Sequence, residues 1–313
     1  MTRSHIDPRN TLNDLSGKEW LQLSRSWWFQ RGLGKNHPHA AIEVQHPAPF
    51  SFRDVQKLTR QFTKPGMTIL DPFCGVASAL KAAALCGRNA IGIEISPTWV
   101  KLGKSRLREE LPTKVKRSVE LRIIRGDCLK VLPSLRTESI DFVVTSPPYW
   151  RILNKDSDHK IRDARLSKGL ALRYSSSPRD LGNVDNYETY LRKLRQVFRA
   201  CHRVLKKNRY MAVVVSDFRH KADFYPLHMH VATEGIRAGF SLKGVMIMVQ
   251  NGKQLYPYGY PFAFVQNIHH QYVLVFQRAR SLTREGGKPK DLVTRGRLDQ
   301  RVDIEPQVER SND

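Results

Sequence analysis

Two consecutive prolines, Pro147 and Pro148, follow a run of β-branched and aromatic residues at positions 140–144. A short apolar run of this kind is typical of a buried strand. Proline has no backbone N–H and a fixed φ, so a Pro-Pro pair cannot continue a sheet ladder. We therefore expect residues 145–150 to leave the carboxyl end of a buried strand as a rigid loop with exposed carbonyl groups.

The groups on this loop are suited to hold the exocyclic amino group of a nucleobase. The nitrogen lone pair is delocalised into the base, and acceptors for the amino hydrogens favour the tetrahedral geometry that methyl transfer requires. The Ser146 hydroxyl and the Pro147 carbonyl are candidate acceptors, and Tyr149 is a candidate to stack on an extruded base. Stacking of a base on an aromatic ring is favourable by roughly 1–3 kcal/mol, and this offsets part of the few kcal/mol that extrusion of the base from the duplex costs. The structural alternative is an ordinary Pro-Pro turn.

A strand, a turn of small residues and a helix follow one another earlier in the chain. Residues 67–70 have a strand pattern, the turn begins at Asp71, and we expect a helix from about Ser78 to Cys86. A turn of small residues lets the backbone approach a nucleotide closely. This segment therefore predicts a nucleotide-binding unit.

Three acidic residues stand at the ends of three successive predicted strands: Asp71, Glu94 after residues 90–93, and Asp127 after residues 121–125. Glu94 lies about 20 residues beyond the turn, the spacing at which an acid reaches ribose hydroxyls in doubly wound folds. Asp127 is placed to accept from an adenine amino group. The alternatives are turn capping by Asp71, surface exposure of Glu94 and helix capping by Asp127. Because ligands bind outside the carboxyl ends of such strands, we expect the acids and the Pro-Pro loop to line one crevice.

The charge balance predicts a polyanionic partner. The 313 residues contain 53 Lys and Arg against 29 Asp and Glu, a formal net charge of +24. Nucleic acid is the partner that such a surplus favours. Charge alone does not separate DNA from RNA.

The four cysteines form no C-x-x-C pair, so we expect neither a disulfide framework nor a zinc knuckle. His37, His39 and His46 lack a fourth ligand, and we expect no metal site. No apolar run has the length of a membrane span, and the N-terminus has no signal-peptide pattern. These features predict a cytoplasmic protein.

Three segments lie outside the main α/β pattern. Residues 1–45 are polar with tryptophans at 20, 27 and 28, for which packing on the main domain is favoured over base contact. Residues 151–185 form a basic insertion that is too long for a routine connection, and we favour a loop that orders on nucleic acid over a solvated insertion. Residues 278–313 are charged and poor in apolar residues, as in a mobile tail. The insertion supplies these basic candidates for nucleic-acid contacts: Lys155, Lys160, Arg162, Arg165, Lys168 and Arg173.

The remaining pattern alternates helices and strands. A helix is expected over residues 51–62 behind Ser51, and another after Asn186 with an amphipathic pattern. Further strands are expected at 210–215, 242–249 and 271–276, with a helix at 226–238. Asp217 either approaches the target base or caps a turn. The aromatic loop at 256–262, with Tyr258 at its centre, either contacts nucleic acid or packs on the protein; Trp150 is a further candidate for nucleic-acid contact.

Together these motifs resemble the DNA amino-methyltransferases, which methylate N4 of cytosine or N6 of adenine with S-adenosylmethionine. The resemblance covers residues 46–277. Residues 71–75 resemble the family's cofactor loop, and residues 145–149 resemble its catalytic motif. It implies catalytic roles for Ser146, Pro147, Pro148 and Tyr149, and cofactor contacts for His46, Phe50, Asp71, Pro72, Phe73, Cys74, Gly75, Ala77, Ser78, Glu94, Ile95, Asp127 and Cys128.

The resemblance also implies a Rossmann-like α/β fold: a seven-stranded, mostly parallel sheet with an antiparallel edge strand and helices on both faces. Double-stranded DNA is the implied partner. The resemblance also implies a nucleoid-associated protein of prokaryotic or phage origin, and a restriction endonuclease is a companion that such enzymes can have. Two departures are visible. Ala77 stands where the family usually has a second glycine, and the cofactor loop precedes the catalytic loop, whereas many relatives have the permuted order.

Ser146 at the first catalytic position favours cytosine N4 over adenine N6 within the resemblance. An RNA amino-methyltransferase is the first competing hypothesis. A dinucleotide oxidoreductase is disfavoured because the turn lacks G-x-G-x-x-G. A cytosine C5 methyltransferase is disfavoured because no Pro-Cys nucleophile follows the fourth strand. A basic nucleic-acid-binding protein with an idle catalytic fold remains the alternative of a different class.

Overall fold

The computed structural model describes residues 6–30, 42, 45–46, 51–150, 174–220, 223–250 and 252–279. All of them belong to one compact unit, Met1–Ala279. Most of the predicted basic insertion and nearly all of the predicted tail lie outside the described residues.

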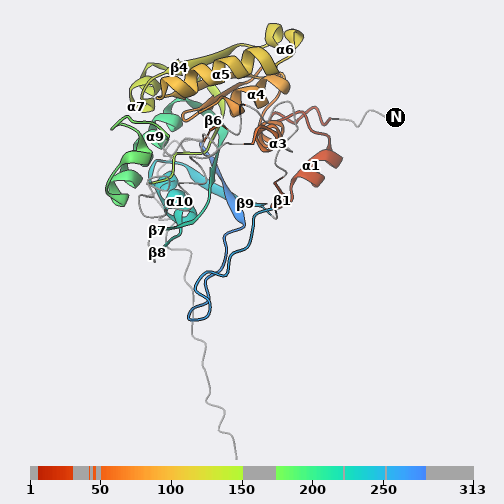
Figure 1. The fold of residues 1–313 in the computed structure, drawn as a ribbon. Coiled ribbons are helices and arrows are strands. Elements are labelled where there is room, and N and C mark those ends of the chain that lie inside the picture. Colours follow the sequence, from red (N-terminus) through yellow and green to blue (C-terminus); the bar gives the residue numbers. More distant parts are fainter. Residues whose placement is uncertain are drawn as a thin grey trace, which may run out of the picture. The chain divides into compact units, whose positions relative to one another are not determined.

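A mixed sheet of eight strands forms the centre of this unit, in the order β1-β9-β10-β6-β5-β2-β3-β4 (Figure 1). A separate two-stranded hairpin consists of β7 and β8. The strands are β1 (Trp27–Phe29), β2 (Thr68–Asp71), β3 (Asn89–Glu94), β4 (Leu121–Arg125), β5 (Ile140–Thr145), β6 (Leu205–Val215), β7 (Phe218–His220), β8 (Asp223–Tyr225), β9 (Ser241–Val249) and β10 (His270–Gln277).

The predicted α/β class and mostly parallel sheet are confirmed, with two differences in detail. Strand β10 is antiparallel to both neighbours, β6 and β9, so the antiparallel strand lies inside the sheet and not at its edge. The edge strand on this side of the sheet is β1, an eighth strand, which pairs in parallel with β9. The N-terminal segment predicted as an appendage therefore contributes a strand to the sheet.

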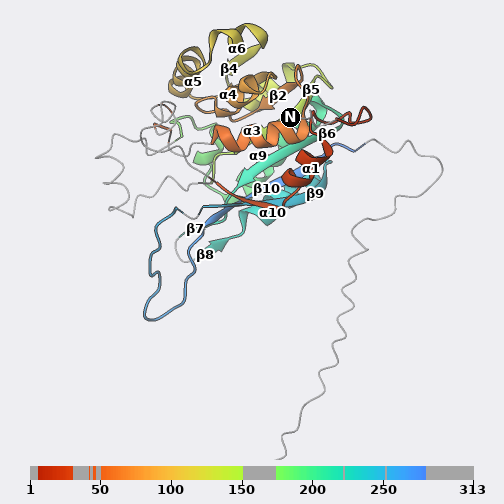
Figure 2. The same ribbon diagram turned by 90° about the vertical axis from the view of Figure 1, so that its right-hand side faces the viewer.

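Helices cover both faces of the sheet (Figures 1 and 2). Helices α3 and α4 pack on one face, and α7, α9 and α10 pack on the other. The bounds are α1 (Gly17–Leu23), α3 (Phe52–Phe62), α4 (Ser78–Leu85), α5 (Pro97–Glu110), α6 (Thr113–Ser118), α7 (Cys128–Val131), α9 (Tyr187–Val204) and α10 (Leu227–Arg237), with 3-10 turns at Leu132–Ser134 and Leu181–Asn183.

Alternation along the strands divides the core into two layers. In β5, Val143 faces the layer of α9, while Phe142 and Val144 face the layer of α3 and α4. Successive strand side chains point to opposite faces, so a strand covered on both sides is apolar at most positions. The buried charge of Asp141 in β5 is paired with Lys206 Nζ at 2.8 Å. All six residues of β5 are buried, and this explains why residues 140–144 lack the usual alternation of apolar and polar residues.

The helix starts follow local capping chemistry. The Asn186 side chain accepts from the Thr189 N–H at the start of α9, as its position in the sequence predicted. Ser51 occupies the N-cap position of α3, but its hydroxyl makes no capping hydrogen bond. Among the described residues, no helix is long and apolar enough to span a membrane.

Candidate active site

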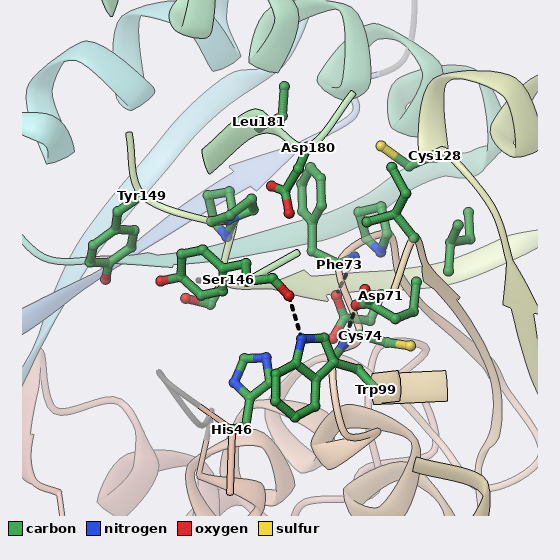
Figure 3. A pocket seen from close by; sticks show the side chains of 18 of the residues that line it. His46, Asp71, Phe73, Cys74, Trp99, Cys128, Ser146, Tyr149, Asp180 and Leu181 are labelled. Carbon is green, nitrogen blue, oxygen red and sulfur yellow. Dashed lines mark hydrogen bonds between the residues drawn. The ribbon is translucent and has the colours of Figure 1, made fainter. Parts of the chain in front are cut away.

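A cavity of about 600 Å³ opens at the carboxyl ends of the parallel strands (Figure 3). It is lined by predicted residues from three strand ends and from the Pro-Pro loop, so the expected single crevice is present. The predicted residues that line it are His46, Asp71, Pro72, Phe73, Cys74, Gly75, Ser78, Glu94, Ile95, Asp127, Cys128, Ser146, Pro147, Pro148 and Tyr149.

Asp71 ends β2 and holds the turn that follows it. Its Oδ1 accepts from the Phe73 N–H at 3.0 Å and from the Thr145 hydroxyl at 2.6 Å. The second bond ties the cofactor-type turn to the last residue of β5, immediately before Ser146. Asp71 is 3% exposed, and burial raises the pKa of its carboxyl to about 7. Asp71 therefore both satisfies a backbone N–H of the turn and lines the cavity.

Glu94 ends β3 and is buried, not on the surface. Its Oε2 accepts from the Gly75 N–H at 2.9 Å, and its Oε1 accepts from the Ser96 N–H at 2.7 Å. Burial raises the pKa of this carboxyl to about 7, and the two backbone N–H groups oppose that shift. A carboxylate oxygen accepts more than one hydrogen bond, so each oxygen keeps acceptor capacity for hydroxyl groups of a ligand.

Asp127 caps α7, because its side chain accepts from the Leu129 N–H at 2.9 Å. It also lines the cavity beside Cys128. Burial is the main cause that raises the pKa of the Cys128 thiol to about 12. The thiol is therefore neutral near pH 7 and forms part of an apolar wall.

Ala77, predicted to contact the cofactor, is fully buried and is not among the residues that line the cavity. It is the N-cap of α4 in the left-handed conformation, with φ 61°. Its methyl group packs where Gly103 of α5 has no side chain: a Cβ built at 103 would lie 3.2 Å from Ala77 Cβ. The loop therefore accommodates alanine at the usual glycine position through a glycine on the neighbouring helix.

The Ser146–Tyr149 loop follows β5 and brings the Tyr149 ring to the cavity. The Ser216 backbone, Gln271 and Ser146 favour the ionised form of the Tyr149 hydroxyl, but burial is the larger effect. Burial raises the pKa of this hydroxyl to about 12, so it is protonated at neutral pH. Tyr149 lines the cavity together with Ser146, Pro147 and Pro148.

Three glutamines that sequence analysis did not single out also line the cavity: Gln30, Gln250 and Gln271. Gln30 donates from Nε2 to Asp54 Oδ2 at 3.0 Å, and its Oε1 accepts from Gln250 Nε2 at 2.6 Å. A carboxylate only accepts, so Asp54 sets the orientation of both amides. Gln250 Oε1 is buried without a hydrogen-bond partner among the described residues.

Further aromatic and acidic residues line the cavity, with Trp99 and His46 on one side and Asp180 on the other (Figure 3). The Trp99 indole donates to the Tyr174 carbonyl at 2.6 Å, and the His46 ring contacts Trp99 edge-on at 4.9 Å. Asp180 accepts from the Ser175 hydroxyl at 2.6 Å and the Gly182 N–H at 2.8 Å. Burial raises its carboxyl pKa. The sequence signal for Asp180 was hidden, because it lies in the segment assigned to the basic insertion.

Trp150 was predicted to contact nucleic acid, and the structure places it in the core instead. It is 8% exposed and packs against the rings of Tyr187 and His220, with centroids 5.1 and 5.2 Å away. Asp217 is also buried, and its carboxylate contacts His228 Nδ1 at 2.7 Å and the His228 N–H at 3.1 Å. It therefore secures the start of α10.

The other predicted nucleic-acid residues divide into two groups. Tyr258 is 51% exposed in the β9–β10 loop. The basic residues at 155, 160, 162, 165, 168 and 173 lie outside the described residues. Phe50, which was predicted to contact the cofactor, also lies outside them.

A sequence model described as DNA methylase matches residues 6–105 and 140–295, which is most of the chain. The chain belongs to the DNA methylase family. S-adenosyl-L-methionine is the cofactor of this family. The matched segments contain the residues that line the cavity from β2, β3, β5 and β10.

Individual relatives match over shorter lengths. The chain is 34% identical over 137 residues to a tRNA (guanine(10)-N2)-dimethyltransferase of Methanocaldococcus jannaschii, covering 41% of this chain and 35% of the relative. It is 33% identical over 96 residues to the type II methyltransferase M.BglI of Bacillus subtilis, covering 30% and 26%. These alignments span about a third or less of each relative.

Among solved structures, the chain is similar to TrmN from Thermus thermophilus. The two align with a TM-score of 0.48 and 16% sequence identity, and the alignment covers 80% of this chain and 54% of TrmN. A SAM-dependent methyltransferase from Aquifex aeolicus aligns with TM-score 0.43 and 14% identity, covering 78% and 100%.

The cavity residues fit S-adenosyl-L-methionine. Ligand cavities of roughly 300–1,000 Å³ suit molecules of this size, and this one has about 600 Å³. Gly75 leaves the turn open at the cavity, since a Cβ there would lie 3.0 Å from His46 Nε2. Glu94 presents buried carboxylate oxygens, which suit the paired hydroxyls of a ribose.

Proposed function

We propose that this protein transfers a methyl group from S-adenosyl-L-methionine to an exocyclic amino group in DNA, with N4 of cytosine as the favoured target. The observation that carries the proposal is that the Ser146–Tyr149 loop and the Glu94 carboxylate line one cavity. When bound, the cofactor supplies an electrophilic methyl group on a sulfonium. Holding donor and acceptor side by side removes much of the entropic part of the barrier.

On the cofactor side, Glu94 binds the ribose hydroxyls and Asp127 accepts from the adenine amino group. Asp71 keeps the turn in place through Phe73 and Thr145. Because Thr145 precedes Ser146, the same carboxylate couples the cofactor loop to the catalytic loop. Pro72, Phe73, Cys74, Gly75, Ser78, Ile95, Cys128 and His46 shape the rest of this subsite.

On the base side, the Ser146 hydroxyl and the Pro147 carbonyl accept from the amino group, and Tyr149 stacks on the base. Gln250 lines the cavity on this side; its Oε1 is buried and unpaired among the described residues, and rotation of the amide when the base binds would present it as a further acceptor. An unpaired buried acceptor costs about 1–3 kcal/mol, and an amino hydrogen of a bound base satisfies it. Strand order supports this division, since β9 and β10 lie on the opposite side of β5 from β3 and β4.

Residues 46–277 form the catalytic region in this proposal, with Gln30 added from the N-terminal segment and residues 151–185 contacting the DNA. Ser146 favours cytosine; adenine N6 is the alternative within the same chemistry. The similarity to a tRNA guanine-N2 dimethyltransferase makes an amino group in RNA the second candidate target.

Mass spectrometry of nucleosides from a methylation-free host that expresses the protein tests the proposal. N4-methylcytosine with the intact protein, and its absence with Ser146→Ala, is the expected result. N6-methyladenine would keep the reaction and change the base. A methylated nucleoside in RNA alone would replace DNA as the substrate, and no methylated nucleoside in either would refute the proposal.

A further inference from the structure

The loop between β9 and β10 carries the most exposed aromatic side chains among the described residues. Phe262 and Phe264 are each 95% exposed, and Tyr260 is 80% exposed. Leu255, Tyr256 and Tyr258 on the same loop are 70%, 48% and 51% exposed. Figures 1 and 2 show the loop extending away from the sheet in both views. Exposed apolar surface of this extent on one loop marks an interaction site.

The loop has a defined internal structure. Asn267 Nδ2 donates to the Tyr256 carbonyl at 2.8 Å, and Asn267 Oδ1 accepts from the Tyr256 N–H at 3.1 Å, closing the base of the loop. At the tip, Gly259 O accepts from the Phe262 N–H at 2.8 Å. Arg219 of β7 donates to the Gln266 carbonyl at 3.0 Å. These bonds fix the backbone and leave the rings in solvent.

The charge around this loop suits a polyanion. The sequence contains no Asp or Glu between Glu234 and Glu285, a stretch that includes β9, the loop and β10. Over the same stretch it contains six basic residues, within a chain of net charge +24: Arg237, Lys243, Lys253, Arg278, Arg280 and Arg284. Phosphate groups therefore meet no carboxylate from this stretch.

The loop is continuous with the active-site cavity. β9 and β5 run in the same direction, because β10 is antiparallel to both β9 and β6 and β6 is parallel to β5. Val249 and Thr145 therefore lie at the same end of the sheet. Gln250 and Lys253, at the base of the loop, line the cavity with Ser146. A nucleotide whose base occupies the cavity thus has its neighbours beside Gln250 and Lys253, and nucleotides farther along the strand lie toward the tip of the loop.

We propose that the β9–β10 loop places Phe262 and Phe264 against bases that flank the target site, beyond the nucleotides at the base of the loop, stacking on them while the target base is in the cavity. This rests on the proposed function. Wedge-like apolar side chains of this type separate base steps, and aromatic stacking stabilises unpaired bases without requiring a particular sequence. The lack of acidic residues in the loop and the position of its base beside the cavity both support this role.

Fluorescence anisotropy with a labelled 20-nucleotide single-stranded oligodeoxynucleotide tests the proposal. The variant is Phe262→Ser/Phe264→Ser, and we expect its dissociation constant to rise about tenfold or more, given the stacking energy per base. The slope of log affinity against log salt should stay unchanged, because no cation is removed. Phe262→Trp/Phe264→Trp should restore the affinity.

Ile236→Ser on α10 is the matched control, because Ile236 is also exposed, at 53%, on another part of the unit. Its dissociation constant should match that of the wild type. Unchanged cofactor affinity in the double serine variant shows that the fold and the cofactor subsite are intact.

Equal affinity of the double serine variant and the wild type would overturn the proposal. If sedimentation equilibrium shows a dimer for the wild type and a monomer for the double serine variant, with equal DNA affinity, then the loop binds a second copy of the chain and not DNA. Loss of DNA affinity in the variant, with no methyl transfer by the wild type, would uphold the loop's role and refute the proposed function.

Discussion

Ala77 and Gly103 form a complementary pair across the turn that follows β2. Ala77 has a left-handed backbone, with φ 61°, and its Cβ lies 3.2 Å from the position of a Cβ at residue 103. The methyl group at one position and the missing side chain at the other belong to one packing arrangement.

This pair predicts a non-additive double-mutant cycle. Gly103→Ala should add an overpacking cost of about 1–3 kcal/mol, offset by a helix-propensity gain of about 1 kcal/mol inside α5. Ala77→Gly removes the nearest contact and the left-handed strain, so in that background Gly103→Ala should cost at least about 0.5 kcal/mol less. Urea unfolding of the four proteins measures the coupling. Strict additivity would show that the pair is not energetically linked.

The two buried acids predict a pH dependence of stability without cofactor. Burial raises the pKa of Asp71 and Glu94 to about 7, above about 4 in the unfolded chain. Between these values the folded state binds protons that the unfolded state has lost, so stability is greatest at low pH in this window. The free energy of unfolding should fall as pH rises from about 4.5 to about 7.

Urea unfolding across that range measures the slope, and Glu94→Gln should flatten it by up to about 1.4 kcal/mol per pH unit. Glu109→Gln, on the exposed side of α5, is the control that should leave it unchanged. A slope that is the same in Glu94→Gln and in the wild type would contradict the buried-acid explanation.

Binding and chemistry should separate between the two sides of the cavity. Ser146→Ala and Tyr149→Ala should lower methyl transfer at least about tenfold, equivalent to about 1.4 kcal/mol, while they keep cofactor affinity. Glu94→Ala should weaken cofactor binding instead. Calorimetric titration with S-adenosyl-L-methionine, beside a single-turnover transfer assay, distinguishes these effects. Full turnover by Ser146→Ala would remove the role assigned to its hydroxyl.

Gln250 should matter for the base and not for the cofactor. Gln250→Met keeps the length of the side chain and removes the unpaired acceptor, so the KM for DNA should rise or kcat should fall, about tenfold in kcat/KM. Gln56→Met on α3 is the matched control, because Gln56 does not line the cavity. Steady-state transfer kinetics provide the test, and equal kcat/KM for the two variants would contradict the assignment.

The parts of the fold and site that sequence predicted are those with local signals. Asp71, Glu94 and Asp127 each follow an apolar strand directly, and parallel strands bring their carboxyl ends to one edge. The Pro-Pro pair marks the fourth strand end equally clearly. Residue order along the chain was therefore enough to assemble these groups in one cavity.

The rest depends on contacts between distant segments. Gln30 and Gln250 are 220 residues apart in sequence, and neither has a neighbouring motif. β1 has only three residues, so the apolar side chains of Trp27 and Trp28 indicated packing but no strand pairing. Trp150 was misassigned because its position after the catalytic motif did not show that Tyr187 and Tyr225 surround it.

The Asp54 carboxylate lies on α3, outside the cavity, yet it sets the direction of the amide chain through Gln30 to Gln250. With an acceptor at the outer end, the chain presents an acceptor at the inner end. An amide at position 54 would permit the reversed arrangement, in which Gln250 offers N–H groups. We therefore expect the residue at position 54, on a helix outside the cavity, to influence whether the pocket prefers an amino or a carbonyl edge, so a substitution there would alter the base preference while the catalytic loop stays the same.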